Sequence, residues 1–467
     1  MSVTVSSGVL GHAGARRRVL VITGDPIAPA MAGPGIRACE LARVLSATMD
    51  VRVASLASVE PVDFPFEIVV AHRTKLIRHV DWADVLVVQG FVLALNPWLA
   101  KTNKVIVADL YDPMHFEHLE DARSLELRAA TREVDQTLAA LTGQLRRADF
   151  FICASEKQRD MWLGHLAAVG RINPFTYAAD DTLRNLIDVV PFGISDEKMS
   201  RTAHGIKGVI DGISANDKVV LWGGGVYNWF DPLTLIRAMA KIATKRNRDT
   251  TSGKREPNAR LFFLGVAHPN PDVAALDMVT RARALSDELG LTGTTVFFNE
   301  TWVPYAERAN YLADADLGVS THLEHLETAF SFRTRILDYL WAGLPVVSTA
   351  GDAFADIIES SGAGIVVPER EVDALSDALE TLLFTKAGTV AAQASHKLST
   401  SFLWSTVAKP LVDFCESATP AADRAVRRRA IPSRFVAPSW LAGKIRGARA
   451  AWQQGGVTGI ARRFSGK

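Results

Sequence analysis

Short runs of apolar, often β-branched residues alternate along the chain with longer amphipathic stretches. In the first half the apolar runs lie at 18–24, 51–57, 84–90, 104–110, 149–155 and 188–193. Such runs predict strands that are buried on both faces, and the amphipathic stretches between them, such as 35–49 and 124–148, predict the helices that cover a parallel sheet. The first half is therefore predicted to form one doubly wound α/β domain.

The same alternation starts again at residue 218. Apolar runs follow at 218–225, 259–265, 294–300, 315–321, 344–349 and 364–368, after a polar, glycine-containing connection at 195–217. The charged stretch 245–258 predicts an exposed loop. We therefore expect a flexible N-terminus at 1–15, Rossmann-like domains at 16–200 and 201–395 that face a central cleft, and a separate tail at 419–467.

Composition supports a two-domain globular protein. The chain has 467 residues, of which 48% are hydrophobic and 22% are charged. A chain of this length is too long for one ordinary hydrophobic core. The net charge is +1, but eleven basic residues and no acid lie in 424–467, which leaves −10 for residues 1–423. Because aromatic residues are interleaved with these cations, the tail suits an anionic membrane surface, and docking to the acidic body is the alternative.

The cysteines and the apolar runs bear on localisation. Cys39, Cys153 and Cys415 lie far apart without a metal-ligand spacing, which is typical of a reducing cytosol. The first fifteen residues do not resemble a signal peptide, and no uninterrupted apolar run reaches the length of a membrane span. A cytoplasmic protein is expected, with peripheral membrane association if the tail binds lipid.

Glycines follow the first predicted strand. Gly33 and Gly35 flank a proline directly before a predicted helix. Glycines at this place let backbone N–H groups approach a phosphate, and the amino end of a helix adds partial positive charge. Since the loop is not a G-x-G-x-x-G fingerprint, a structural turn stays as the alternative to an anion site.

Carboxylates and imidazoles gather after the predicted strand 104–110, namely Asp109, Asp112, His115, Glu117 and His118. Such groups at the carboxyl end of a strand can orient or deprotonate a hydroxyl, which makes Asp109, Asp112 and His115 candidate catalytic residues. A metal site is an alternative, but the spacing matches no usual ligand pattern and no metal is predicted. Asp112 could also simply cap a helix.

A second glycine-rich turn at 223–225 follows the strand that opens the second series. Its glycines allow close approach of the backbone to an anion or a sugar, so Gly224 and Gly225 are candidate ligand-binding residues. Asp231 and Pro232 predict the N-cap and the first residue of the next helix. The aromatic residues of this segment suit either the core or a sugar face.

The stretch 327–349, ETAFSFRTRILDYLWAGLPVVST, places charges in an otherwise apolar segment. A helix that starts near Phe332 would carry Arg333 and Arg335 in its first turns, where acids are usual. Guanidinium groups bind phosphate oxygens in bidentate fashion and keep their charge, so both arginines are predicted to hold a diphosphate. Asp338 could accept hydrogen bonds from ribose hydroxyls or pair with Arg335. Gly343 is expected to end the helix.

The segment FSFRTRILDYLWAGLPVVST and the following GDAFADIIESSGAGIVVP resemble the carboxyl-terminal signature of the family 4 retaining glycosyltransferases, which have the two-domain GT-B fold. GPGIRACELA, ADFFICASEKQRD, VVPFGI and FLWSTVAKPL match further segments in the expected order, so the resemblance covers residues 18 to about 415. It implies an acceptor-side domain at 16–200, a nucleotide-sugar domain at 201–395, and a helix at 396–418 that crosses back.

The resemblance also carries a departure. Many members have two glutamates separated by seven residues; the second aligns with Asp338, but Phe330 stands at the place of the first. Glu327 or Glu324 would then take over the contact to the donor sugar. The usual basic pair after the first strand of the second domain is replaced by GGGVYNWFD, and Arg333 and Arg335 would supply its charge.

By this resemblance the backbone near Trp302 and Val303 would hold the nucleobase. The candidate catalytic residues are His115, Asp112, Asp109 and Glu327. The candidate donor-binding residues are Gly33, Gly35, Gly224, Gly225, Trp302, Val303, Phe332, Arg333, Arg335 and Asp338.

The implied reaction moves a sugar from a nucleoside-diphosphate sugar to a hydroxyl acceptor, a glycan or a lipid-linked glycan, with retention at the anomeric carbon. In such enzymes the leaving diphosphate helps to deprotonate the acceptor, so neither a metal nor a cofactor is expected. No nucleic-acid partner is expected either. Cell-envelope polysaccharide or glycolipid synthesis is the expected setting. A non-catalytic partner of another transferase is one alternative; an epimerase or phosphorylase on the same fold is another, although no motif for either is found.

Overall fold

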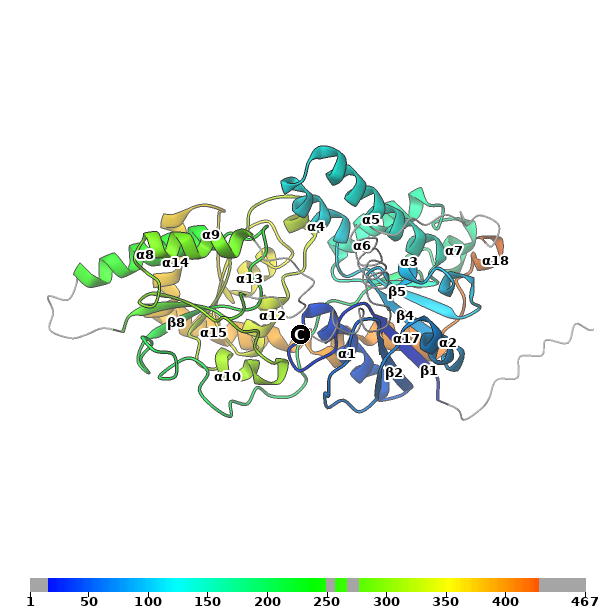
Figure 1. The fold of residues 1–467 in the computed structure, drawn as a ribbon, viewed down its shortest axis with the longest axis horizontal. Helices are drawn as coiled ribbons and strands as arrows, with labels where there is room; N and C mark the ends of the chain where they lie inside the picture. The colour runs from blue at the N-terminus through cyan, green and yellow to red at the C-terminus, as the bar shows by residue number, and fades with distance from the viewer. Residues whose placement is uncertain (1–15, 249–256, 267–276, 428–467) are drawn as a thin grey trace, which may run out of the picture.

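The computed structural model describes residues 16–248, 257–266 and 277–427. Two α/β domains lie beside each other along the length of the molecule (Figure 1). The predicted flexible N-terminus at 1–15 and most of the basic tail lie outside the described residues. None of the described helices combines the length and the apolar character that crossing a bilayer requires.

The first domain is built on a parallel sheet of seven strands in the order β3-β2-β1-β4-β5-β6-β7. Its strands are β1 (Arg18–Thr23), β2 (Asp50–Ser55), β3 (Glu67–Val70), β4 (Val85–Gln89), β5 (Val105–Asp109), β6 (Phe150–Cys153) and β7 (Ile187–Val189). The central strands are buried along their whole length, because helices cover both faces. The hydrophobic pattern does not predict β3, a four-residue edge strand that is only partly buried.

Helices cover the first sheet: α1 (Gly33–Ser46), α2 (Arg73–Trp82), α3 (Val92–Leu95), α4 (Met114–Asp121), α5 (Leu127–Arg147), α6 (Glu156–Ala168) and α7 (Pro174–Ala179). The predicted helices at 35–49 and 124–148 correspond to α1 and α5. Helices α4 and α5 form a hairpin that rises beside the second domain (Figure 1).

The second domain repeats this design with a sheet of six parallel strands in the order β10-β9-β8-β11-β12-β13. Its strands are β8 (Lys218–Trp222), β9 (Ala259–Phe263), β10 (Val296–Phe298), β11 (Leu317–Ser320), β12 (Val346–Thr349) and β13 (Gly364–Val367). The helices are α8 (Pro232–Arg248), α9 (Asp277–Glu288), α10 (Arg308–Leu312), α11 (Leu326–Phe330), α12 (Thr334–Trp341), α13 (Ala355–Ser361), α14 (Val372–Phe384) and α15 (Lys386–Ser399). Two parallel, helix-covered sheets confirm the predicted fold class.

The ends of α8 and α12 follow their sequence signals. The Asp231 carboxylate accepts a hydrogen bond of 3.0 Å from the Thr234 backbone N–H and so caps α8. Beyond the end of α12, Gly343 has a φ of 64°, a conformation that a residue with a Cβ rarely adopts.

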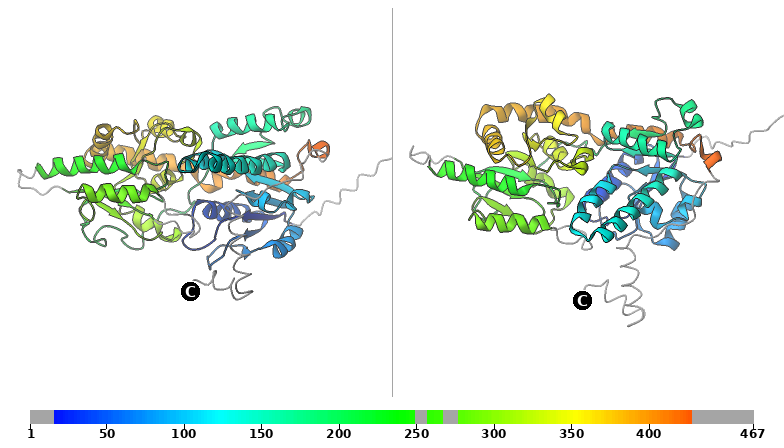
Figure 2. Two further views of the ribbon diagram at one scale, coloured as in Figure 1. Left: turned by 45° about the horizontal axis from the view of Figure 1, so that its top comes forward. Right: turned by 90° about the horizontal axis from the view of Figure 1, so that it is seen from above.

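The chain returns to the first domain after α15. The helices α16 (Trp404–Val407) and α17 (Lys409–Ser417) lie against it (Figure 1), and Figure 2 shows this orange segment reaching both domains. The Phe414 ring stacks on Phe150 of β6, with 4.2 Å between ring centroids. Trp404 packs on Gly193 so closely that a Cβ there would lie 2.6 Å from its ring. Only glycine fits at this crossing.

The last described residues are held on the first domain. In α18 (Arg424–Arg427), Arg424 pairs with the buried Asp149, and Arg427 pairs with Asp149 and with Asp423. The first cations of the predicted tail thus meet carboxylates of the acidic body. Residues 428–467 lie outside the described residues.

Candidate functional site

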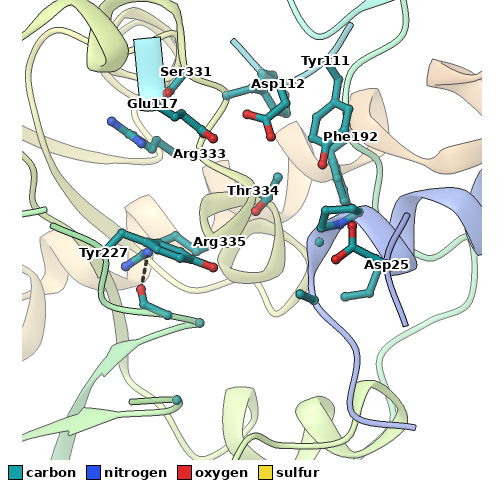
Figure 3. A pocket seen from close by; sticks show the side chains of 18 of the residues that line it. Asp25, Tyr111, Asp112, Glu117, Phe192, Tyr227, Ser331, Arg333, Thr334 and Arg335 are labelled. Carbon is teal, nitrogen blue, oxygen red and sulfur yellow. Dashed lines mark hydrogen bonds between the residues drawn. The ribbon is translucent and has the colours of Figure 1, made fainter. Parts of the chain in front are cut away.

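A cavity of about 1020 Å³ lies between the two domains. Its walls come from loops that follow strands: Asp25 follows β1, Tyr111 and Asp112 follow β5, the glycines 223–225 follow β8, and Gly265 follows β9. Because ligands of open α/β sheets bind outside the carboxyl ends of the strands, this cavity is the expected ligand site. Figure 3 shows its interior.

The glycine turn after β8 is fixed by α12. The Tyr339 hydroxyl accepts a hydrogen bond of 2.7 Å from the Gly223 backbone N–H, and it donates to the Val319 carbonyl at 2.9 Å. Gly224 has a φ of 83°, so the turn needs a residue without a Cβ. Gly224 and Gly225, both candidate donor-binding residues, line the cavity.

Arg335 lies at the floor of the cavity beside this turn. Its Nη2 donates a hydrogen bond of 2.8 Å to the Gly225 carbonyl, and its guanidinium lies 4.1 Å from the Phe230 ring centroid. The side chain is 8% exposed, and its Nη1 has no hydrogen-bond partner in the described part of the chain. Burial lowers the pKa of Arg335 to about 10. A charged group therefore lines the cavity with a donor unused.

Arg333 also lines the cavity but is already paired. Its two terminal nitrogens each donate a 2.8 Å hydrogen bond to the carboxylate of Glu327, and one of them also reaches the Thr328 hydroxyl at 3.0 Å. Glu327 itself is 1% exposed and does not line the cavity. Its predicted place as a carboxylate facing the sugar is therefore not what the structure shows.

Asp338 lies at the cavity wall, but the possible pair with Arg335 does not form. Asp338 accepts a hydrogen bond of 3.2 Å from Arg308 instead. Arg308 also donates to the Tyr305 carbonyl and lies 3.6 Å from the Tyr305 ring centroid. The i to i+3 alternative is therefore wrong, and Arg308 is a third guanidinium at the same wall.

The opposite wall, from the first domain, is acidic. Asp25, Asp112, Glu117 and Asp121 line it. Burial, with the nearby Asp112, raises the pKa of Asp25 to about 6. Burial likewise raises the pKa of Asp121 to about 6 and raises the pKa of Asp112 and, most strongly, of Glu117. The cavity thus has guanidinium groups on one side and carboxyl groups on the other.

Besides Glu327, two more candidate catalytic residues, Asp109 and His115, lie outside the cavity. Asp109 is buried and accepts hydrogen bonds of 2.7 and 2.9 Å from Arg37. The His115 ring packs among Phe116, Trp162 and His165, and burial lowers the pKa of His115 to about 4. The ring points away because α4 begins at Met114 and turns its first residues toward α6. Asp112 does line the cavity, and its side chain does not cap α4.

The remaining donor-binding candidates also divide into residues that line the cavity and one that does not. Gly33 lines the cavity, but Gly35 does not, and a Cβ at Gly35 would lie 2.9 Å from the Pro26 carbonyl oxygen. Gly35 therefore serves close packing. Trp302, Val303 and Phe332 all line the cavity.

Sequence reasoning missed several cavity residues. Asp25 directly follows the glycine that ends the first predicted strand, so the strand-end rule could have found it. Tyr227, Tyr305 and Arg308 also line the cavity. The last two lie on the short helical segment between β10 and β11, which carries no recognisable motif. Across the described residues, no group of three or more His, Cys, Asp or Glu side chains could hold a metal ion.

Comparison with known proteins gives a family match for the second domain. Residues 217–384 match the family model described as glycosyl transferases group 1. No curated protein matches the chain.

Among solved structures, the chain resembles Alr3699/HepE from Anabaena in complex with UDP and glucose, with a TM-score of 0.60 and 16% identity over 86% of this chain and 100% of that one. Sucrose-phosphate synthase from Thermosynechococcus elongatus gives 0.58 and 16% over 86% and 99%. WaaG, a glycosyltransferase involved in lipopolysaccharide biosynthesis, gives 0.58 and 18% over 85% and 99%. The second domain of the chain therefore matches the glycosyl transferases group 1 model, and the chain as a whole has the two-domain GT-B fold of these solved structures.

Proposed function

We propose that the protein transfers a sugar from a nucleoside-diphosphate sugar to a hydroxyl acceptor, with retention at the anomeric carbon. The observation that carries this proposal is Arg335. A guanidinium that is buried at the floor of a large cavity, has an unused N–H donor and has no carboxylate partner among the described residues is costly unless an anion binds there.

The diphosphate is the anion that fits best. The glycine turn 223–225 lies beside Arg335, so backbone N–H groups and the guanidinium can share its oxygens. Asp338 lies at the same wall for the ribose hydroxyls, and Trp302 and Val303 line the part that we assign to the base. These assignments follow the site residues that were inferred from the sequence.

The opposite charges of the two cavity walls support the assignment of the donor to one wall and of the acceptor to the other. Arg335 would stabilise the charge that develops on the leaving diphosphate. The acidic wall of the first domain offers hydrogen-bond acceptors to a hydroxyl group and repels anions, so it suits the acceptor. We propose that the leaving diphosphate takes the acceptor proton on the same face. No metal ion has a part in this proposal, so transfer should persist in EDTA.

A lipid-linked acceptor is the class that we favour. Three exposed leucines lie on the α4–α5 hairpin, namely Leu119, Leu125 and Leu127. Leu125 also lines the cavity, so an apolar surface continues outward from the acidic wall. We propose that the acceptor carries an apolar chain there, as in glycolipid or cell-envelope synthesis. The enzyme would then work in the cytoplasm, peripherally on the inner face of the membrane.

The test begins with binding and hydrolysis. UDP, GDP, ADP and dTDP are titrated by calorimetry, and the matching sugar nucleotides are screened for hydrolysis by mass spectrometry, starting with UDP-glucose, which a similar Anabaena structure holds. Arg335→Ala should weaken nucleotide binding by about tenfold or more, which is roughly 1.4 kcal/mol. Arg281→Ala, at an exposed arginine of α9 away from the cavity, is the control. Equal binding by wild type and Arg335→Ala would refute the donor site.

A second candidate function is a non-catalytic partner of another transferase. The Glu327–Arg333 pair favours it, because it removes the carboxylate that many members direct at the donor sugar. Nucleotide binding without hydrolysis or transfer of any screened sugar nucleotide would support this alternative.

A further inference from the structure

His118 of α4 lines the cavity and has no part in the proposed donor site. Its ring stacks on Phe91, which follows β4 and also lines the cavity, with 5.7 Å between the ring centroids. His115, nearly one turn earlier on the same helix, is buried among aromatic rings and lies outside the cavity. Of these two histidines, His118 is therefore the one that is placed to meet a ligand.

Two linked hydrogen bonds determine which nitrogen of His118 carries a proton. The Thr137 hydroxyl of α5 donates to the backbone carbonyl of Glu133 at 3.0 Å, and its oxygen lies 2.6 Å from the His118 Nδ1. Thr137 is 2% exposed, so bulk water does not compete for the single hydroxyl proton. Because a carbonyl oxygen can only accept, this proton goes to Glu133, and the Thr137 oxygen accepts from Nδ1. His118 therefore carries a proton on Nδ1.

The other ring nitrogen, Nε2, is left with an open lone pair. Burial lowers the pKa of His118, against the opposing effect of the Glu133 carboxylate, so the ring is neutral near pH 7 and holds one proton. Thr137 is the hydrogen-bond partner that the described residues give the ring. Since Nδ1 is directed at α5, the edge that carries Nε2 lies on the other side of the ring and is available to the cavity.

The charges around His118 select the kind of group that can meet Nε2. Among the described residues, the first-domain wall of the cavity contributes carboxyl groups, including Asp121 and Glu133, and no lysine or arginine. A phosphate or a carboxylate would bring a negative charge to this wall and offers no hydrogen-bond donor when it is ionised. A hydroxyl group brings a donor and no charge. The geometry therefore suits a neutral, hydroxyl-bearing ligand.

We propose that His118 binds a hydroxyl group of the acceptor by accepting its hydrogen bond at Nε2. This inference rests on the proposed function, because it takes the first-domain wall as the acceptor side. His118 touches the substrate, whereas Thr137 is a positioning residue that acts through His118 by holding the proton on Nδ1. In a lipid-linked acceptor, a neutral sugar and not a phosphate then lies against His118.

The position of the proton is tested without any substrate. The full chain is labelled with nitrogen-15 in histidine, and two-bond correlation spectra near pH 7 distinguish the protonated nitrogen of each ring from the unprotonated one. The His118 signals are those that disappear in His118→Phe. We expect a protonated Nδ1 and an unprotonated Nε2. A proton on Nε2 of the wild type would overturn the proposal.

Variants of Thr137 test its positioning role. Thr137→Val removes the hydroxyl but keeps the shape, so the His118 proton should move, at least in part, from Nδ1 to Nε2, whereas Thr137→Ser should keep the wild-type tautomer. Thr131→Val is the matched control, because Thr131 lies on the same helix, donates in the same way to the Leu127 carbonyl and does not line the cavity. An unchanged tautomer in Thr137→Val would refute the role of Thr137.

Hexyl glycosides serve as probes for the acceptor. Hexyl β-D-glucoside, hexyl β-D-galactoside and hexyl α-D-mannoside each join a neutral sugar to a short apolar chain, and hexyl phosphate carries the same chain on an anion. We expect at least one glycoside to shift the Nε2 resonance of His118 in a saturable titration, and hexyl phosphate to leave it in place. His396, on α15 and outside the cavity, should not respond. No shift with any glycoside, or an equal shift with hexyl phosphate, would overturn the proposal.

Calorimetry with the glycoside that shifts His118 measures the strength of the contact. His118→Phe keeps a ring on Phe91 but has no nitrogen, so the Kd for the glycoside should rise by about tenfold or more. A smaller rise would show that Nε2 does not hold the hydroxyl.

The two proposals fail differently. If the wild type binds none of the nucleoside diphosphates, the proposed function is refuted whatever the tautomer of His118. If nucleotides bind but no glycoside shifts the His118 resonance, only the His118 subsite is refuted.

Discussion

Gln158 of the first domain donates a hydrogen bond of 2.8 Å from its Nε2 to the carbonyl oxygen of Phe330 in the second domain. The same nitrogen donates to the Tyr111 carbonyl at 2.8 Å, and the Gln158 Oε1 accepts from the Ala154 N–H. The side chain is fully buried. One glutamine therefore joins the loop after β5, which forms the acidic wall, to the end of α11, which precedes the arginines.

We expect Gln158→Leu to loosen the contact between the domains. It leaves buried backbone groups without partners, which should lower the free energy of unfolding by about 1–3 kcal/mol. It should also raise the radius of gyration in small-angle X-ray scattering and raise the KM for the donor. Gln144→Leu is the control, because Gln144 is buried but bonds to Gly90 within the first domain. If Gln158→Leu lowered the free energy of unfolding without raising the radius of gyration, the Gln158 hydrogen bond would not be what holds the two domains together.

Asp109 offers a test between catalysis and structure. Its carboxylate accepts two hydrogen bonds from Arg37, from Nε and Nη2, and a third from Gln89. Arg37 also donates to the Val190 and Pro191 carbonyls. Removing one partner of a buried pair leaves the other uncompensated, so Asp109→Ala should lower the free energy of unfolding by about 3–5 kcal/mol.

Urea unfolding measures this change. Asp109→Asn should destabilise less, because the amide oxygen still accepts from Arg37. If the purified Asp109→Asn protein keeps wild-type stability and loses turnover by orders of magnitude, Asp109 acts in the chemistry after all.

The sequence pattern predicted the two sheets, but it could not show which residues of a loop direct their side chains into the cavity. Asp112 and His115 follow the same strand three residues apart, and only the start of α4 at Met114 turns one into the cavity and the other toward Trp162. Arg333 and Arg335 are equivalent in the pattern, yet the buried partner Glu327 reaches only the first. Such choices depend on contacts between elements, which hydrophobic periodicity does not encode.

The effect of pH on nucleotide binding can be predicted for Asp25. Its pKa is raised to about 6 by burial and by Asp112, so the group is charged above this pH and mostly neutral below it. A negative charge on the cavity wall opposes an anionic ligand. Wild type should therefore bind a nucleoside diphosphate more weakly than Asp25→Asn at pH 8, by about threefold to tenfold, and the two proteins should converge near pH 5.

Calorimetry at several pH values measures the ratio of the two dissociation constants. The ionisation of the nucleotide itself is common to both proteins and cancels in this ratio. A ratio that stays constant from pH 5 to pH 8 would show that the Asp25 charge does not reach the ligand.

The basic tail calls for a truncation that the structure helps to place. Arg424 and Arg427 pair with Asp149 and Asp423, both fully or almost fully buried, so a cut before Arg424 would leave these carboxylates with fewer partners and would confuse folding with binding. A cut after Arg427 keeps these ion pairs and removes nine of the eleven basic residues of 424–467.

We expect this shorter chain to keep its unfolding temperature and its binding of nucleoside diphosphates. Each basic residue near an anionic bilayer contributes about 1 kcal/mol, so binding to phosphatidylserine vesicles should fall by at least about tenfold in a sedimentation assay. Equal vesicle binding by the two chains would leave the α4–α5 leucines as the remaining contact to test.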